Sequence, residues 1–292
     1  MMLLTLVCLL SFWINPAAQA ADFDFHHTLL TKELHKYVDN DRLHYKRWQK
    51  SPTNLAKYVD SLASISPDQL DQLSADDKTA LWLNAYNAET IKAVLDNYPI
   101  PGNNPYYPTG SFRQIPDGWD TFSVNMGGRT FTLDQLEHES LRQVHDPRTH
   151  FAVVCAANGC AKIRPNAFQS ATLAKDLAEC TDKFLADRKN IEIDTKNKTI
   201  KVTQLFKWFP LDFSKAAGLA RKFPPPTDDL IVLTYLSKTL PDKVVSVLAN
   251  RDELLNYKVI YRPFDWALND ADAKPAPEPV TAGSGVPAQA GH

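Results

Sequence analysis

The chain has 292 residues, with 32 basic and 34 acidic side chains and a formal net charge of −2. This near balance gives no electrostatic basis for binding nucleic acid, and the sequence contains neither a Cys-x-x-Cys pair nor a glycine-rich phosphate loop. We therefore expect no nucleic-acid partner and no cofactor. About 250 residues of ordinary globular composition are enough for a single domain with a substantial core.

The two ends of the chain differ from the rest in composition. Residues 1–13 are almost wholly apolar, and Ala18-Gln19-Ala20 matches the small-x-small pattern of a signal-peptidase site. We predict a signal peptide over residues 1–20, a periplasmic or secreted product, and no stable membrane span after cleavage. Residues 271–292 are rich in Ala, Pro and Gly, a composition that buries too little apolar surface to fold, so we predict a disordered tail.

Helical patterns dominate the first half of the mature chain. An N-terminal segment over residues 21–64 contains predicted helices at 23–38 and 54–63. Further helices are expected at 67–73 and 76–97, the second of which begins after Ser74 and stops before Pro99. Met126-Gly127-Gly128-Arg129 then indicates a hairpin between strands 122–124 and 130–132, and a helix over 134–144 follows.

The second half mixes helices with short strands. The expected elements are a strand at 150–155, a helix at 170–187, a hairpin of strands 191–194 and 199–203, helices at 228–238 and 242–249, and a strand at 257–261. Segregated runs of this kind predict an α+β fold, in which a helical N-terminal part packs on a small mixed or antiparallel sheet.

The most informative stretch is residues 150–165, which brings one imidazole and two thiols to a predicted strand and turn. Side chains alternate along a strand, so His150 and Cys155 are expected on opposite faces, whereas Cys160 follows the Asn158-Gly159 turn and can reach either face. Cys160 is therefore the candidate nucleophile and His150 its general base. A Cys155–Cys160 disulfide is equally compatible with an exported chain, and Cys180 is expected to be a buried core residue.

Two asparagines on the long helix are candidates for supporting roles. Asn84 and Asn87 are three residues apart and lie on one face of a helix that is apolar almost all round. One interpretation is that these buried amides hold the backbone of a neighbouring loop. The other is that they donate to an oxyanion or orient His150, as Asn does in Cys-His enzymes.

A catalytic imidazole needs a carboxylate that fixes its tautomer, and two aromatic-rich segments each offer one. Asp212 and Asp265 are both candidates, and Asp265 fits slightly better because it follows a predicted strand. A zinc site made of His138, His145 and His150 is disfavoured by its spacing, so no metal is expected.

Several motifs appear together and in order, and through them the chain resembles the bacterial and plant family known as domain of unknown function 547 (DUF547). The motifs are Trp82–Asn87, Leu133–Arg142, Arg148–Cys155, Phe206–Phe209 with Asp212-Phe213, and Phe264–Asn269. The resemblance implies a DUF547-like domain over residues 65–270. Where the family usually has Ser-Cys-Pro, this chain has Gly159-Cys160-Ala161.

The resemblance draws attention to the polar residues within the motifs without supplying a reaction. It adds candidate binding residues, namely Glu137, Arg142, Arg148, Cys155, Lys207 and Asp212. A histidine that opens an apolar strand is also similar, by analogy, to the histidine strand of transglutaminase-like and papain-like enzymes.

Three functions follow as hypotheses. The first is an exported thiol hydrolase or acyltransferase that acts on an amide or peptide, with Cys160, His150, Asp265 and Asn84 or Asn87 in its site. The second is a non-catalytic envelope binding module with a structural Cys155–Cys160 disulfide. Thiol–disulfide redox chemistry by the two cysteines is a weaker third, because their spacing differs from that of the usual redox motif.

Overall fold

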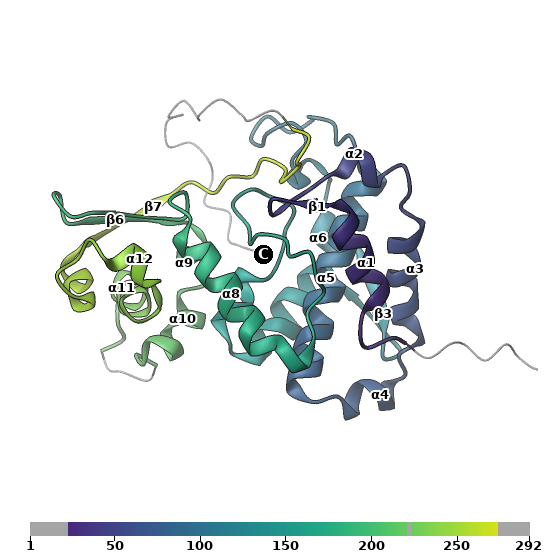
Figure 1. The fold of residues 1–292 in the computed structure, drawn as a ribbon, viewed down its shortest axis with the longest axis horizontal. Helices are drawn as coiled ribbons and strands as arrows, with labels where there is room; N and C mark the ends of the chain where they lie inside the picture. The colour runs from purple at the N-terminus through teal and green to yellow at the C-terminus, as the bar shows by residue number, and fades with distance from the viewer. Residues whose placement is uncertain (1–22, 221–223, 274–292) are drawn as a thin grey trace, which may run out of the picture.

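The computed structural model describes residues 23–220 and 224–273. The predicted signal peptide, and all but the first three residues of the predicted tail, lie outside the described residues. Within them, the expected α+β organisation is confirmed: helices pack beside two two-stranded hairpins and a three-stranded sheet, and the three-stranded sheet lies at one edge of the molecule (Figure 1).

The N-terminal segment is helical, as predicted, and contains a very short hairpin that the sequence did not reveal. Helix α1 begins five residues later than expected, after His27, whose backbone is left-handed. The elements in order are α1 (Thr28–Tyr37), β1 (Val38–Asp39), β2 (Arg42–Leu43), α2 (Tyr45–Trp48), α3 (Thr53–Ser61), η1 (Leu62–Ser64) and α4 (Pro67–Gln72).

The long helix α5 (Ala75–Asn97) is the centre of the core. Its start is fixed by Ser74, whose hydroxyl accepts a hydrogen bond from the backbone N–H of Asp77. Leu81, Leu83 and Tyr86 are fully buried, and most of the helix is enclosed by its neighbours. A helix buried nearly all round can support loops on several sides at once.

The predicted first hairpin is confirmed, and N-terminal helices pack on it. Strands β3 (Ser123–Met126) and β4 (Arg129–Thr132) are antiparallel, and both turn glycines, Gly127 and Gly128, have positive φ. Helices α3 and α5 contact β3 (Figure 1). The helical N-terminal part therefore does lie on a small antiparallel sheet.

The segment after this hairpin is helical but only partly α-helical. It comprises α7 (Leu133–Gln135), the π-helix η3 (Leu136–Leu141) and the 3₁₀-helix η4 (Arg142–Val144). In the π-helix the backbone N–H of Arg142 bonds to the carbonyl of Glu137, five residues earlier. A wider turn of this kind brings residues five apart close to the same direction, which an α-helix does not do.

The strand predicted at residues 150–155 is wrong. Pro147–Phe151 forms the 3₁₀-helix η5, which begins where the Asp146 carboxylate accepts the backbone N–H of Arg148. The following residues are irregular, because no strand in the described part of the chain supplies their hydrogen bonds. A short run of apolar residues is buried whether its backbone is a strand or irregular. The apolar pattern alone therefore could not distinguish a strand from an irregular segment.

The C-terminal half carries the three-stranded mixed sheet, in the order β5-β6-β7, with β6–β7 parallel. The predicted hairpin and final strand are confirmed, and helix α8 lies between this half and the N-terminal helices (Figure 1). Helices α9 and α10 had not been predicted. The elements are η6 (Ser170–Thr172), α8 (Leu173–Ala186), β5 (Ile191–Asp194), β6 (Thr199–Thr203), α9 (Leu205–Trp208), α10 (Pro210–Ala217), α11 (Asp228–Thr239), α12 (Asp242–Val245), η7 (Arg251–Asn256) and β7 (Lys258–Arg262).

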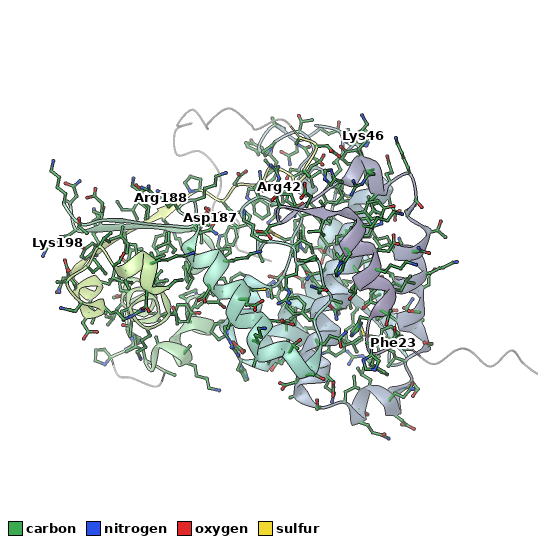
Figure 2. The ribbon with its side chains drawn as sticks, viewed as in Figure 1. Phe23, Arg42, Lys46, Asp187, Arg188 and Lys198 are labelled. Carbon is green, nitrogen blue, oxygen red and sulfur yellow. A yellow bond between two sulfur atoms is a disulfide. The ribbon has the colours of Figure 1, made fainter. Side chains whose placement is uncertain are left out.

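Charged side chains project from the edges of the molecule, among them Lys46 in α2 and Lys198 at the tip of the β5–β6 hairpin (Figure 2). In residues 23–220 and 224–273 we find no helix with the length and apolarity needed to cross a bilayer.

Candidate ligand-binding site

A hollow of about 520 Å³, partly open to solvent, lies where three distant parts of the chain meet. One wall comes from residues 113–137, the second from residues 150–160, and the third from α9 and the segment after β7. Aromatic rings contribute much of the lining, from Trp119, Trp208, Phe209, Phe264 and Trp266. Concave aromatic surfaces with a few polar groups are typical of small-molecule sites.

His150 enters this hollow with one ring nitrogen already engaged. Its Nε2 lies 2.9 Å from Oδ2 of Asp212, and its ring stacks on Phe209 with 4.3 Å between ring centres. Since an ionised carboxylate only accepts hydrogen bonds, we assign the Nε2 proton to this bond. No described residue hydrogen-bonds to Nδ1 of His150.

Arg142 and His150 both donate hydrogen bonds to Asp212 and hold it in its charged form. Arg142 donates from Nε to Oδ2 at 2.8 Å and from Nη2 to Oδ1 at 3.0 Å. Partial burial raises the pKa of Asp212, but the hydrogen bonds from His150 and Arg142 outweigh burial and bring the pKa down to about 2. Of the two carboxylates considered from the sequence, Asp212 is therefore the partner of His150.

Asp265, the carboxylate preferred from the sequence, has a different position. Its side chain is exposed and accepts the backbone N–H of Ala267, while its carbonyl accepts the N–H of Gly159. The prediction that Asp265 pairs with His150 is wrong. His150 lies in the 3₁₀-helix η5, and its ring is paired with Asp212.

The two cysteines of the hollow form a disulfide, Cys155–Cys160, with 5.8 Å between their Cα atoms. Both line the hollow together with His150, so the expected placement of His150 and Cys155 on opposite faces does not hold. Irregular backbone after η5 removes the alternation on which that expectation depended. Cys180 is the one free cysteine of the described residues, and it is buried, as expected.

Arg113 is a cation in the wall of the hollow that forms no salt bridge within the described residues, although Glu137 in the same hollow is near enough to favour its charged form. Its guanidinium lies over Trp119 at 4.7 Å and over Trp266 at 4.4 Å, and its Nε is buried without a hydrogen-bond partner in the described residues. Burial lowers the pKa of Arg113 from its ordinary value. Sequence reasoning missed this residue, because it lies in a Pro- and Gly-rich stretch with neither periodicity nor a motif.

Glu137 provides an acidic group in the same hollow, as its predicted binding role requires. A chain of hydrogen bonds leads to it: Trp119 Nε1 donates to the Tyr86 hydroxyl at 3.1 Å, and that hydroxyl donates to Oε2 of Glu137 at 3.0 Å. The π-helix turns Glu137 and Arg142 toward the site from five positions apart. The second oxygen of Glu137 has no hydrogen bond to a described residue.

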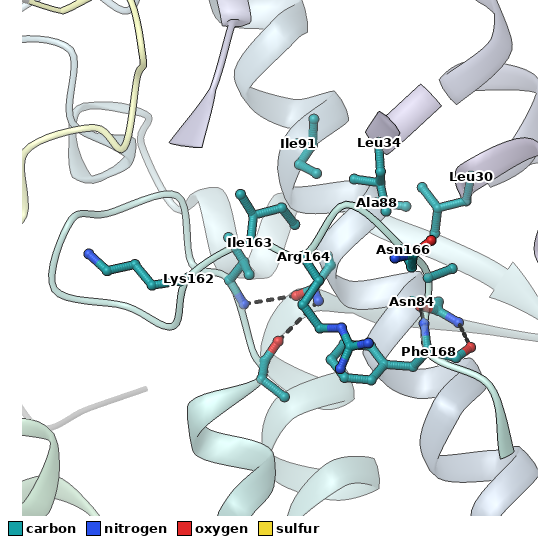
Figure 3. A pocket seen from close by; sticks show the side chains of 14 residues that line it. Leu30, Leu34, Asn84, Ala88, Ile91, Lys162, Ile163, Arg164, Asn166 and Phe168 are labelled. Carbon is teal, nitrogen blue, oxygen red and sulfur yellow. Dashed lines mark hydrogen bonds between the residues drawn. The ribbon is translucent and has the colours of Figure 1, made fainter. Parts of the chain in front are cut away.

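Asn84 and Asn87 hold backbone instead of facing the hollow. Asn84 donates to the carbonyl of Phe168 and accepts its N–H, both at 2.8 Å (Figure 3). Asn87 donates to the carbonyl of Ala152 at 3.1 Å and accepts the N–H of Val154 at 2.8 Å. Each amide thus makes the hydrogen bonds to backbone that a neighbouring strand would otherwise make. This agrees with the first interpretation from the sequence, in which the buried amides hold the backbone of a neighbouring loop.

The asparagines belong to a second, more tightly packed pocket of about 310 Å³, between α1, α5 and residues 162–168 (Figure 3). Apolar side chains from both helices, including Leu30, Leu34 and Ile91, close it. We regard it as an imperfectly filled packing interface.

Two other predicted binding residues lie outside the hollow. Arg148 forms an ion pair with Asp146, at 2.7 Å, beside the start of η5. Lys207 is exposed, with its Nζ 5.9 Å from the ring centre of Tyr261. Within the described residues no group of three or more His, Cys, Asp or Glu side chains is placed to hold a metal, so His138, His145 and His150 do not form a zinc site.

Comparison with known proteins gives one match. Residues 70–185 match the family described as "Protein of unknown function, DUF547". The match includes Arg113, Glu137, His150 and both bridged cysteines but ends before Asp212 and the aromatic residues of α9. Neither the curated proteins nor the solved structures gave a significant match.

Proposed function

We propose that this chain, which contains a DUF547 region at residues 70–185, is an exported binding protein for a small zwitterionic ligand with an aromatic or apolar body. Aromatic amino acids and the ends of short peptides have this chemistry. The predicted signal peptide supports export, and the aromatic hollow supports the choice of ligand.

The buried Nε of Arg113, which has no hydrogen-bond partner within the described residues, is the observation that carries the proposal. A partly buried cation that forms no salt bridge within the described residues is unfavourable, and the two tryptophan faces compensate only in part. A ligand carboxylate would provide the acceptor that Nε lacks, in a planar arrangement that suits a guanidinium. The anionic end of the ligand is therefore assigned to Arg113.

Glu137 suits the opposite end of the same ligand. One of its oxygens is held by Tyr86, which fixes the carboxylate, and the other has no partner among the described residues. An ammonium group or another donor on the ligand would bind there. Planar groups between these two ends would lie against Trp119 and Trp266, whose rings already contact each other at 6.2 Å between centres.

The disulfide favours binding over cleavage. With Cys155 and Cys160 joined, the hollow contains no thiol that could act as a nucleophile, and Cys180 lies on α8 outside it. The resting protein therefore suits the role of a binding module better than that of a thiol hydrolase.

Tryptophan fluorescence tests the proposal directly, because three tryptophans line the hollow. The oxidised full chain is titrated with L-phenylalanine, with its amide, which lacks the carboxylate, and with its N-acetyl derivative, which lacks the ammonium. We expect saturable binding of phenylalanine and affinity about tenfold weaker, or more, for each derivative, since a charged hydrogen bond contributes roughly 1.5–3 kcal/mol.

Two arginine variants provide the matched comparison. Arg113→Gln should bind the acid and the amide equally, whereas Arg129→Gln should behave as wild type, because Arg129 stacks on Phe131 at 4.8 Å in the β3–β4 hairpin. Absence of binding by all three probes, or wild-type discrimination in Arg113→Gln, would rule out the assigned role of Arg113.

A second candidate is the thiol-dependent hydrolase or acyltransferase, and the paired His150 and Asp212 favour it. Their 2.9 Å contact is the imidazole–carboxylate pair of a triad, and both cysteines border the same hollow. Such an enzyme would require reduction of the bridge. Cleavage of a peptide anilide that appears only after reduction, is lost in Cys160→Ser and persists in Cys180→Ser would support it; cleavage independent of reduction, or absent from the reduced chain, counts against it.

A further inference from the structure

The two sulfurs of the Cys155–Cys160 bridge differ in accessibility. Cys155 is partly exposed, whereas Cys160 is only 3% exposed, and both border the aromatic hollow. A thiol that enters from solvent can therefore approach Cys155 more easily. Which sulfur is attacked determines which one leaves, so this asymmetry gives the bridge a direction of reaction.

Contacts other than the disulfide hold the loop between the two cysteines. Asn158 and Gly159 donate their backbone N–H groups to the carbonyls of Ala267 and Asp265, at 2.8 and 2.9 Å, and the N–H of Asn269 returns to the carbonyl of Ala156 at 3.1 Å. An isolated bridge pairs Ala157 with Leu268. These contacts would remain after reduction, so the fold does not depend on the sulfur–sulfur bond to close this loop.

The hollow also provides an acid–base group. Asp212 fixes Nε2 of His150, and Nδ1 has no partner among the described residues. In its doubly protonated form, an imidazole held in this way can give its Nδ1 proton to a thiolate as it leaves, and the neutral ring can take the proton back when the bond re-forms.

From these three features we infer that the Cys155–Cys160 bridge is a thiol–disulfide exchange site for dithiols that can enter the hollow. A dithiol, as its monothiolate, attacks Sγ of Cys155; the sulfur–sulfur bond breaks, and Cys160 leaves as a thiolate that takes the Nδ1 proton of the His150 imidazolium. The second thiol of the reagent gives its proton to the now neutral His150 and attacks its own sulfur in the mixed disulfide, and Cys155 leaves as a thiolate that takes a proton from water. The bridge gains two electrons, and the dithiol loses two and becomes a cyclic disulfide.

The first test is reduction of the native full chain by dithiothreitol at pH 7, quenched with iodoacetamide and mapped by peptide mass spectrometry. We expect Cys155 and Cys160 to become labelled together, while Cys180 stays unlabelled and the circular dichroism of the folded chain is unchanged. Reduction that occurs only in urea, or that unfolds the chain, would show that the bridge is a structural staple and overturn the inference.

Variants test direction and acid catalysis separately. In Cys160→Ser the remaining Cys155 should react with Ellman's reagent at least about tenfold faster than Cys160 does in Cys155→Ser, because access to the two sulfurs differs. His150→Gln should slow reduction of the intact bridge by about tenfold or more. The control His145→Asn should leave the rate unchanged, since His145 is exposed and asparagine accepts its left-handed backbone.

Equal reactivity of the two cysteines, or an unchanged rate in His150→Gln, would contradict the mechanism. Binding of phenylalanine is measured on the oxidised chain and does not depend on exchange, so the two proposals can fail independently.

Discussion

The segment from His150 to Phe168 has two sides that differ in how their polar groups are used. Toward α5, the amides of Asn84 and Asn87 exchange hydrogen bonds with backbone at Phe168, Ala152 and Val154. Toward the hollow, Nε of Arg113, Nδ1 of His150 and one oxygen of Glu137 have no hydrogen-bond partner among the described residues.

Whether a polar group is paired or unpaired therefore distinguishes structural from functional residues, whatever their chemical type. Polar groups that are buried and fully paired stabilise a fold, and removing one leaves its partners unsatisfied. Polar groups that face a hollow unpaired contribute less to the fold and are available to a ligand. Substitutions on the two sides should therefore have opposite effects on stability and on binding.

The largest effect on stability is expected for Asn87→Ala. The change leaves the carbonyl of Ala152 and the N–H of Val154 unsatisfied, and each costs about 1–3 kcal/mol, so we expect a loss of roughly 2–6 kcal/mol. Urea denaturation measures it. The control Asn97→Ala lies on the same helix, where its amide bonds only to the carbonyl of Ala93, and should lose less than 1.5 kcal/mol, about one ordinary hydrogen bond. Equal losses in the two variants would contradict the anchoring role.

Glu89 is an exception to the contrast between the two sides. It lies on α5 and is only 3% exposed, yet its Oε2 has no hydrogen-bond partner in the described residues. Burial raises its pKa from 4.5 to about 7. The folded state therefore holds this proton more tightly than the unfolded state, and stability should fall as pH rises from about 4.5 to 7, by roughly 3 kcal/mol. Glu89→Gln should remove this contribution and be the more stable protein at pH 8; a wild-type pH profile in the variant would show that Glu89 is paired.

Asp212 should give a smaller effect at lower pH. Its folded pKa of about 2 lies below the ordinary 3.8, so the stabilisation is present above pH 4 and is lost as pH falls toward 2. We expect roughly 1–2 kcal/mol, reduced for solvent screening of a partly exposed group. Chemical denaturation of wild type and Asp212→Asn at several pH values measures the difference. Parallel profiles between pH 4 and 2 would mean that Arg142 and His150 do not hold the charge.

The smallest effect on stability is expected for Arg113→Gln. No ion pair is lost, because none to Arg113 occurs among the described residues, and the stacking on two tryptophans contributes modestly. We expect a change within about 1 kcal/mol in thermal denaturation without ligand. A loss comparable to that of Asn87→Ala would instead place Arg113 among the structural residues.

Local signals in the sequence predicted much of the fold. Ser74 marked the start of α5, and the predicted hairpin of strands 191–194 and 199–203 gave β5 and β6 at their observed bounds. Such signals depend only on near neighbours. The strand prediction for residues 150–155 was wrong because the backbone there bonds to a side chain of α5, Asn87, and pairs with no strand of residues 23–220 or 224–273.

The site was predicted less completely. His150, Glu137 and both cysteines were identified and do border one hollow, yet the choice of Asp265 over Asp212 depended on a strand that does not form. The alternation rule also separated His150 from Cys155 for the same reason. Arg113 could not be found, because only tertiary packing brings the ring of Trp266, which is distant in sequence, to its guanidinium.

The most direct test of the central claim, that polar groups in the hollow await a ligand, is the NMR signal of the Arg113 Nε–H, assigned by its absence in Arg113→Gln. On titration with L-phenylalanine we predict a downfield shift of this proton and slower exchange with water, as a carboxylate accepts it, and no such change with L-phenylalaninamide. A signal that is unchanged by phenylalanine, or already hydrogen-bonded in the free protein, would contradict the account.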